Sequence, residues 1–410
     1  MRFSQLCIAF GARIASPIGL LVLIGVLSRL LPFSEMAVFL KGYAVCVILG
    51  ALADGGVRLS LFSCVRRARS SGGVAFAKEY QEAAVIRKVF SFICAVVGFF
   101  AFSLLVDDAS VATRLLFAGY ALVLSASDIN LILLRACNCN AAEALALIVE
   151  QVLSVCFAVF FCVFLGASAE YAVLGLICGG FARMALGREI VSRLDLIGSA
   201  SRRPWLDVVR DLDVRSAVAS VGGEVIATVF PRVPVILLGG MLEAEPYAVF
   251  AAIFTLLVRG EIVLTTVIQS AYGKRSSWGR RLDESSMACV ALGGAYAIPI
   301  ALVATEFSDL LTRVYLGESL VAYADYAAYA GLAVFLGYPL FTLRLVVQYG
   351  NGGMYVIVGA AIGILVQVLA YRTNMEGWQI SLPYMLGCCA YSFILMYGFA
   401  RVRRRNGGMA

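Results

Sequence analysis

Cations inside apolar runs are the residues of this sequence best suited to chemistry. Arg13, Arg232 and Arg259 lie deep in such runs, and Lys41 lies in another. A guanidinium keeps its proton at ordinary pH and binds phosphate oxygens through a planar fork of N–H donors. A charge in hydrocarbon is costly, so each of these cations needs an anion or water nearby. These residue types therefore indicate the binding of an anionic group within a membrane.

Carboxylates in the same kind of run leave a second interpretation open. Glu224 precedes Arg232 by eight residues, about 80° around a helix, so a neighbouring helix is needed to pair them. Internal pairing and substrate contact both stay open for the deep cations, with contact favoured for Arg232 and Arg259. The carboxylates could instead bind a coupling proton or sodium ion. They are Asp54, Asp128, Glu150, Glu224 and Glu261.

Other arginines lie near the ends of apolar runs, and we expect their side chains to extend to the lipid headgroups. They are Arg29, Arg58, Arg114, Arg183 and Arg344.

The stretch VFPRVPVILLGG, residues 229–240, places Arg232 between Pro231 and Pro234. Proline removes a backbone donor and loosens a helix. The freed carbonyl groups are tolerable where the backbone borders a water-filled cleft instead of lipid. We therefore predict that residues 229–240 line a water-filled path.

Composition indicates the elements that hold these residues. Of 410 residues, 61% are hydrophobic and 14% are charged, against about 25% charged in soluble proteins. Apolar runs of about 20 residues, enough to cross a bilayer, recur along the chain. Spanning segments are helical because lipid offers the backbone no partners. We predict an all-α polytopic membrane protein with twelve helices, near 7–31, 36–60, 89–106, 112–134, 144–166, 169–187, 215–239, 246–271, 287–306, 326–348, 353–372 and 380–400. Arg13 interrupts the first run, so we do not expect a cleaved signal.

Loop charge predicts the orientation. The segments that alternate with acidic loops are rich in Lys and Arg, including Arg87, Lys88 and the tail RVRRR at 401–405. Basic loops stay in the cytoplasm, so both termini are predicted inside. The net charge of +7 is then a topology signal, and no nucleic-acid partner is expected.

Several kinds of site are excluded or unsupported. The chain has no histidine, which excludes histidine-based catalysis and histidine-ligated metals. Most of the twelve cysteines lie in spans, where they act as small hydrophobic residues, and Cys137 with Cys139 makes a weak metal site. No Walker-type loop is present. We expect no enzyme activity and no cofactor beyond a coupling proton or sodium ion.

A polar stretch divides the chain. Residues 188–213 form a predicted cytoplasmic linker between an N-terminal lobe, 1–187, and a C-terminal lobe, 214–410. The stretch SEMAVF at 34–39 resembles EPYAVF at 245–250, and each follows the first helix of its half. Two lobes of six helices share one orientation and are expected to enclose a central cleft.

Two stretches carry a family resemblance: LSRLLPFSEMAVFLKGYAVCVILGALADGGVR at 27–58, and LLTRVYLGESLVAYADYAAYAGLAVFLGYPLF at 310–341. They resemble the polysaccharide transporter family of the multidrug/oligosaccharidyl-lipid/polysaccharide exporter superfamily. The Gly-Tyr pair usual after the first outside turn is replaced by Met36-Ala37 here, and by Pro246-Tyr247 in the second half.

The resemblance implies a flippase of the bacterial inner membrane. Its substrate would be an undecaprenyl-diphosphate-linked repeat unit of O-antigen, capsule or exopolysaccharide, moved outward by alternating access. Membrane lipids, a polysaccharide polymerase and a chain-length regulator are the implied partners. A multidrug exporter of the same superfamily is the main alternative, but it would favour an acidic lumen. A membrane polymerase is disfavoured, because the longest outside loop has only about 20 residues, 306–325.

Overall fold

A computed structural model describes most of the chain as helix. The described residues are 3–53, 73–106, 109–137, 139–194, 225–226, 228–261, 264, 282–349, 353–373 and 375–407, and none of these is in a β-strand. Within these ranges, nine helical segments are long and apolar enough to cross a membrane. The prediction of a multi-pass, all-α membrane protein is confirmed.

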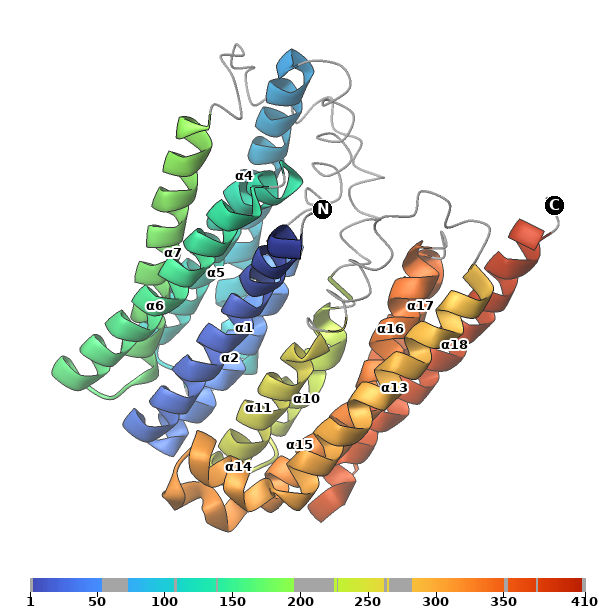
Figure 1. The fold of residues 1–410 in the computed structure, drawn as a ribbon. Coiled ribbons are helices and arrows are strands. Elements are labelled where there is room, and N and C mark those ends of the chain that lie inside the picture. Colours follow the sequence, from blue (N-terminus) through green and yellow to red (C-terminus); the bar gives the residue numbers. More distant parts are fainter. Residues whose placement is uncertain are drawn as a thin grey trace. The chain divides into compact units, whose positions relative to one another are not determined.

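The chain forms two compact units, Met1–Val225 and Ile226–Ala410. Unit 1 contains α1 (Phe3–Leu30), α2 (Phe33–Ala53), α4 (Gly73–Leu105), α5 (Val111–Ala136), α6 (Asn140–Phe164) and α7 (Ala169–Arg193). Inside this unit α6 packs on α1 and α7, and α5 packs on α4 and α7 (Figure 1). The α5–α7 group therefore forms one side of the unit's core.

Unit 2 begins with the short 3-10 helix η1 (Phe230–Arg232), followed by α10 (Val233–Leu238) and α11 (Ala244–Arg259). Next come α13 (Leu282–Glu306), α14 (Ser308–Tyr315), η3 (Glu318–Tyr323), α15 (Asp325–Phe335), α16 (Gly337–Tyr349), α17 (Gly353–Ala370), η4 (Gly377–Ser381) and α18 (Leu382–Gly407). The helix α18 packs on α17 and α16, whereas α13 packs on α15 and α16.

Helix boundaries differ from the predicted ones at several places. The predicted helix 89–106 begins much earlier, as α4 starts at Gly73. The predicted helix 326–348 consists of α15 and α16, with a turn at Leu336 between them. The predicted helices 36–60, 215–239 and 246–271 lie partly outside the described residues.

The predicted linker 188–213 begins as helix, because α7 continues to Arg193. Residues 195–213 lie outside the described residues. The lobe boundaries 1–187 and 214–410 stay predictions, next to an observed division at Val225 and Ile226.

The short internal repeat lies at equivalent places in the two units. Phe39 is on α2 and Phe250 is on α11, and both side chains are fully buried. Each is about two turns into its helix, since α2 starts at Phe33 and α11 starts at Ala244. The two similar stretches thus place a buried phenylalanine at the same distance from the start of a helix in each unit.

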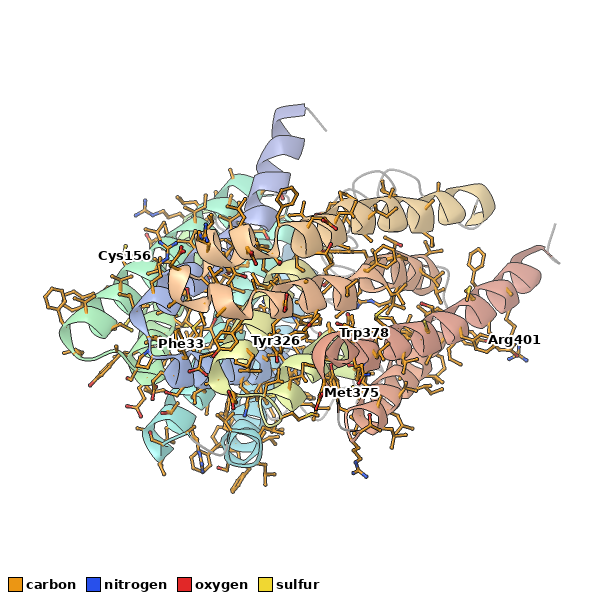
Figure 2. All side chains as sticks on the ribbon, turned by 90° about the horizontal axis from the view of Figure 1, so that it is seen from below. Phe33, Cys156, Tyr326, Met375, Trp378 and Arg401 are labelled. Atoms are coloured by element: carbon orange, nitrogen blue, oxygen red, sulfur yellow. The ribbon has the colours of Figure 1, made fainter. Side chains whose placement is uncertain are left out.

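Large apolar side chains cover the outer surfaces of the helices, as expected of a surface that meets lipid. Phe92, Phe100 and Leu104 of α4 are all more than 60% exposed. Figure 2 shows Trp378 and Arg401 toward opposite ends of the η4–α18 segment. Trp and Arg at the two ends of a span fit the two membrane–water interfaces.

Candidate functional site

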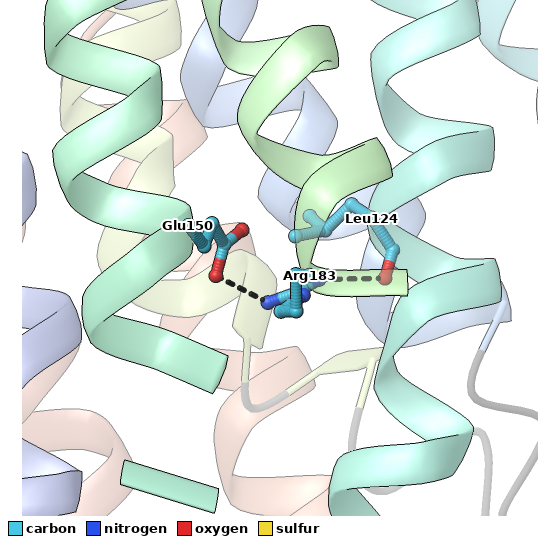
Figure 3. Close-up of polar contacts among 3 residues, drawn as sticks. All are labelled: Leu124, Glu150 and Arg183. Atoms are coloured by element: carbon cyan, nitrogen blue, oxygen red, sulfur yellow. Dashed lines mark hydrogen bonds and ion pairs between the residues drawn. The ribbon is translucent and has the colours of Figure 1, made fainter. Parts of the chain in front are cut away.

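A buried ion pair joins three helices of unit 1. Arg183 of α7 and Glu150 of α6 are only 4% and 3% exposed, and Arg183 Nη1 lies 2.9 Å from Glu150 Oε2. Arg183 Nη2 also donates to the carbonyl oxygen of Leu124 on α5, at 3.1 Å (Figure 3). The guanidinium is thus held from two neighbouring helices at once.

The sequence of α7 makes this close approach possible. Gly175, Gly179, Arg183 and Gly187 recur every four residues and so share one face of the helix. A Cβ at Gly179 would overlap Ser154 Oγ of α6 and lie 2.7 Å from the carbonyl oxygen of Glu150. The glycines let the α6 and α7 backbones approach, which brings Glu150 within reach of Arg183.

The expected position of Arg183 is therefore wrong. An arginine near the end of a span was expected to extend to the headgroups, but the Arg183 side chain turns inward. It does so because the Glu150 carboxylate and the Leu124 carbonyl lie on the same face of α7 as the glycines. Pairing with an arginine was one of the alternatives left open for Glu150, and the structure places a buried ion pair there. Its partner is Arg183 instead of one of the deep arginines.

A second buried cation lies nearby in unit 1. Arg87 of α4 is 2% exposed, and its Nε donates to the carbonyl oxygen of Ser125 on α5 at 2.7 Å. The Ser91 and Ser125 hydroxyls hydrogen-bond to each other across the same two helices. Arg87 was counted as a loop charge, but α4 extends through it and buries it against α5. The side of the membrane on which it lies stays a prediction.

In unit 2, Arg232 lies where the helix changes form. Phe230–Arg232 is a 3-10 turn that leads into α10, with Pro231 and Pro234 near the two helix starts. The prediction that the prolines loosen this helix is confirmed. Arg232 is half-buried, and its Nη1 donates to the carbonyl oxygen of Thr228 at 3.1 Å.

Aromatic and amide side chains surround this turn. The Phe230 ring centroid lies 5.4 Å from that of Tyr384 and 5.2 Å from that of Tyr391, both on α18. Gln367 of α17 donates to the Phe230 carbonyl oxygen at 3.4 Å. Arg232 lies on the same short turn as Phe230, next to these rings. Glu261 is half-buried two residues after the end of α11, and its role stays a prediction.

The sequence reasoning missed Tyr384, Tyr391 and Gln367. All three side chains are nearly or fully buried in unit 2. The available signal was the polar residue type itself inside an apolar run, with Tyr384 and Tyr391 seven residues apart on one helical face.

The remaining predicted residues are placed only in part. Arg259 is the last residue of α11 and is half-buried, as is Lys41 on α2. Arg13 and Asp128 lie on α1 and α5, but their side chains are outside the described part of the structure. Asp54 and Glu224 lie outside the described residues altogether. The roles of all of these stay predictions.

Metal and disulfide sites were searched over the same described residues. No group of three or more His, Cys, Asp or Glu side chains there could hold a metal ion. Ten cysteines, Cys137 and Cys139 among them, are free thiols. The described part of the molecule thus offers charged and aromatic side chains for binding instead of a metal centre.

Comparison with a family model identifies the chain. The model described as polysaccharide biosynthesis protein matches residues 6–272, which is more than half of the sequence. The chain belongs to this family. A search of the curated proteins finds no match.

Solved structures agree on the fold. An inward-facing and an outward-facing multidrug resistance transporter of the MATE family, in the MOP superfamily, each give a TM-score of 0.64. Their sequences are 12% and 14% identical to this chain. Each alignment covers 99% of this chain, and it covers 96% of the inward-facing and 95% of the outward-facing transporter. A MOP superfamily transporter from Pyrococcus furiosus gives a TM-score of 0.65 at 13% identity, with 98% of each chain covered.

The family match confirms the sequence-based resemblance to a polysaccharide family, and the similar structures of MOP superfamily transporters confirm the fold. The protein is a multi-pass membrane protein of the polysaccharide biosynthesis family. The fold that this chain shares with these transporters agrees with the predicted fold class.

Proposed function

We propose that this protein is a flippase for a polyprenyl-diphosphate-linked oligosaccharide. The substrate would be an undecaprenyl-diphosphate-linked repeat unit of O-antigen, capsule or exopolysaccharide, moved across the bacterial inner membrane. The observation that carries the proposal is Arg232, a half-buried guanidinium on a proline-flanked 3-10 turn within a polysaccharide transporter chain. The diphosphate is the part of the substrate that a guanidinium binds best.

The physical problem explains the arrangement. The sugars and diphosphate of such a lipid lose their hydration in hydrocarbon, at a cost of several kcal/mol for each polar group. Fixed cations on a wet surface replace part of that hydration, while the prenyl tail stays in lipid. Alternating access then exposes the bound headgroup first to one side and then to the other. Arg13, Lys41, Arg232 and Arg259 are the proposed cations.

Energy coupling is part of the same proposal. A proton or sodium ion bound by a membrane carboxylate would drive the change between the two open states. Asp54, Asp128, Glu224 and Glu261 are the proposed positions. Glu150 fits pairing better than coupling, because its carboxylate already neutralises Arg183.

The test is the amount of surface polysaccharide in cells whose only copy is Arg232→Ala or Arg259→Ala. We expect a loss of about tenfold or more, as for a removed charge-assisted contact. Arg193→Ala is the matched control, because that arginine is 79% exposed and pairs with Glu189 of its own helix. Normal polysaccharide with normal membrane levels of both variants would contradict the proposal.

A swap of Glu224 and Arg232 separates the alternatives. If the two residues form an internal ion pair, the exchanged pair restores polysaccharide to the wild-type amount. If Arg232 contacts the diphosphate, the swap stays as defective as Arg232→Ala.

A multidrug exporter is the second candidate function, because two of the similar solved structures are multidrug resistance transporters. The third similar structure is described as having a binding pocket of reverse polarity that suggests a different function. The fold is thus compatible with more than one pocket charge, and the cations of this chain fit anions. Unchanged drug susceptibility on deletion, together with lost polysaccharide, would separate the two functions.

A further inference from the structure

The buried face of α18 is unusually polar. Tyr384, Cys388 and Tyr391 follow one another at spacings of four and three residues, so they share one side of the helix. Their side chains are at most 1% exposed. This face points into unit 2, where Phe230, Gln367 and α16 meet it.

Several polar atoms in this region have no hydrogen-bond partner within the described residues. They are Arg344 Nε, Tyr391 Oη and Gln367 Oε1, all inaccessible to solvent. The buried Tyr384 hydroxyl also has no hydrogen-bond partner among the described residues. An unsatisfied buried polar group costs about 1–3 kcal/mol, so native proteins rarely keep several together without a ligand, ion or water.

The register of α16 and α18 brings these groups into two layers. A Cβ at Gly337 would lie 3.2 Å from the Tyr384 hydroxyl, so position 337 of α16 is opposite Tyr384. Seven residues later on both helices stand Arg344 and Tyr391, so the same register places these two positions opposite each other. Seven residues correspond to a rise of about 10 Å.

Each layer contains one arginine and one tyrosine. Arg232 lies on the same short turn as Phe230, whose ring contacts Tyr384, and Arg344 lies opposite Tyr391 in the register of α16 and α18. The Phe230 ring touches both tyrosine rings and therefore lies between the layers.

We propose that unit 2 carries a two-step anion track along α18, with Arg232 and Tyr384 as one step and Arg344 and Tyr391 as the other. The track rests on the proposed function and assigns Arg344, Tyr384 and Tyr391 to the diphosphate of the substrate. Two hydroxyl groups and a guanidinium are donors, which suits the acceptor oxygens of a diphosphate. The Gln367 carbonyl is an acceptor and suits a sugar hydroxyl group.

Two binding positions about 10 Å apart would make it easier for the diphosphate to move through the protein. A single strong site would hold the diphosphate at one depth and resist its release. Two weaker sites allow the anion to pass from one cation to the next, as binding must be strong enough for entry and weak enough for exit.

The experiment is a titration of the purified full-length protein with undecaprenyl diphosphate, followed by native mass spectrometry from nanodiscs of phosphatidylcholine. These nanodiscs have no net anionic headgroups that could occupy Arg344. We expect Arg344→Ala to weaken binding by about 10- to 100-fold, and Tyr391→Phe by about 3- to 10-fold.

Tyr247→Phe is the matched control. Tyr247 is as buried as Tyr391, but its hydroxyl already donates to the Val235 carbonyl oxygen at 2.9 Å. We expect it to bind the probe as the wild type does. Tyr391→Phe keeps the shape of the side chain, so the test stays decisive even if Arg344→Ala folds poorly.

The outcomes separate the track from the proposed function. If the wild type binds and both the Arg344 and Tyr391 variants bind equally well, the track is wrong, its polar atoms bind only water, and the flippase proposal stands. If the wild type binds undecaprenyl diphosphate no better than undecaprenol, which lacks phosphate, both proposals fail.

Discussion

The inward-facing arginines of the two units differ in their hydrogen-bond partners. In unit 1, Arg183 is buried between α5, α6 and α7, where Glu150 and the Leu124 carbonyl satisfy it. In unit 2, Arg344 stays half-buried, and its buried Nε has no partner within the described residues. A buried charge that a fixed carboxylate neutralises stabilises an arrangement, whereas one with open donors is suited to a ligand.

The difference follows from the neighbouring helices. The α7 face of Gly175, Gly179 and Gly187 permits close packing, so unit 1 can exclude water around its ion pair. Unit 2 places aromatic rings and hydroxyl groups around its cations instead. We therefore expect changes in unit 1 to alter stability, and changes in the α18 track to alter binding.

The largest effect on stability is expected from Glu150→Ala. Removal of one partner from a buried ion pair leaves an uncompensated charge and costs about 3–5 kcal/mol. Thermal unfolding of the detergent-purified protein measures the loss. The double variant Glu150→Gln with Arg183→Met should recover most of it, and an equally unstable double variant would contradict the pairing interpretation.

Gly179→Ala tests the packing that makes the ion pair possible. The added Cβ would collide with Ser154 Oγ of α6, so we expect a loss of about 1–3 kcal/mol in the free energy of unfolding. Gly294→Ala in α13 is the matched control, because a Cβ there meets nothing within 4 Å. Similar behaviour of the two variants would show that the α6–α7 approach tolerates side chains.

A pair of tyrosines sharpens the comparison within unit 2. Tyr247→Phe removes a hydroxyl that is bonded to the Val235 carbonyl, and should cost about 1 kcal/mol. Tyr391→Phe removes a hydroxyl without a partner in the described structure, and should leave stability unchanged or slightly higher. Thermal unfolding without substrate lipid tests both, and a marked loss for Tyr391→Phe would indicate a structural role.

The smallest effect is expected from Arg193→Ala. Its side chain is 79% exposed, and its pair with Glu189 is a surface contact between residues four apart on α7. Such pairs contribute about 0.3–0.5 kcal/mol. Unfolding at low and high salt should differ little between this variant and the wild type, in contrast to any variant of Arg183 on the same helix.

Much of the fold was predictable because it depends on composition. Runs of about 20 apolar residues must be helices in lipid, so the existence and order of the described spans followed from the sequence. The helix ends were less predictable. A hydropathy pattern predicts a loop at charged residues such as Arg87 and Arg193, but both residues lie on helices.

The candidate site was predictable only for its type of chemistry. Arg232 stood out because its charge and its prolines are visible in one short stretch. Arg183 and Arg344 have the same sequence character, an arginine near the end of an apolar run, and they have different environments. What separates them is the partner on another helix, which sequence spacing does not contain.

The sequence by itself determined that this chain spans a membrane repeatedly, belongs to a polysaccharide biosynthesis family, and carries cations within apolar runs. These properties depend on residue type and on local runs, which need no knowledge of the neighbouring helices. Only the tertiary structure decided that Glu150 neutralises Arg183, and that Phe230 lies between Tyr384 and Tyr391. A charge or hydroxyl is satisfied by atoms within about 3 Å, and helix packing alone determines which atoms those are.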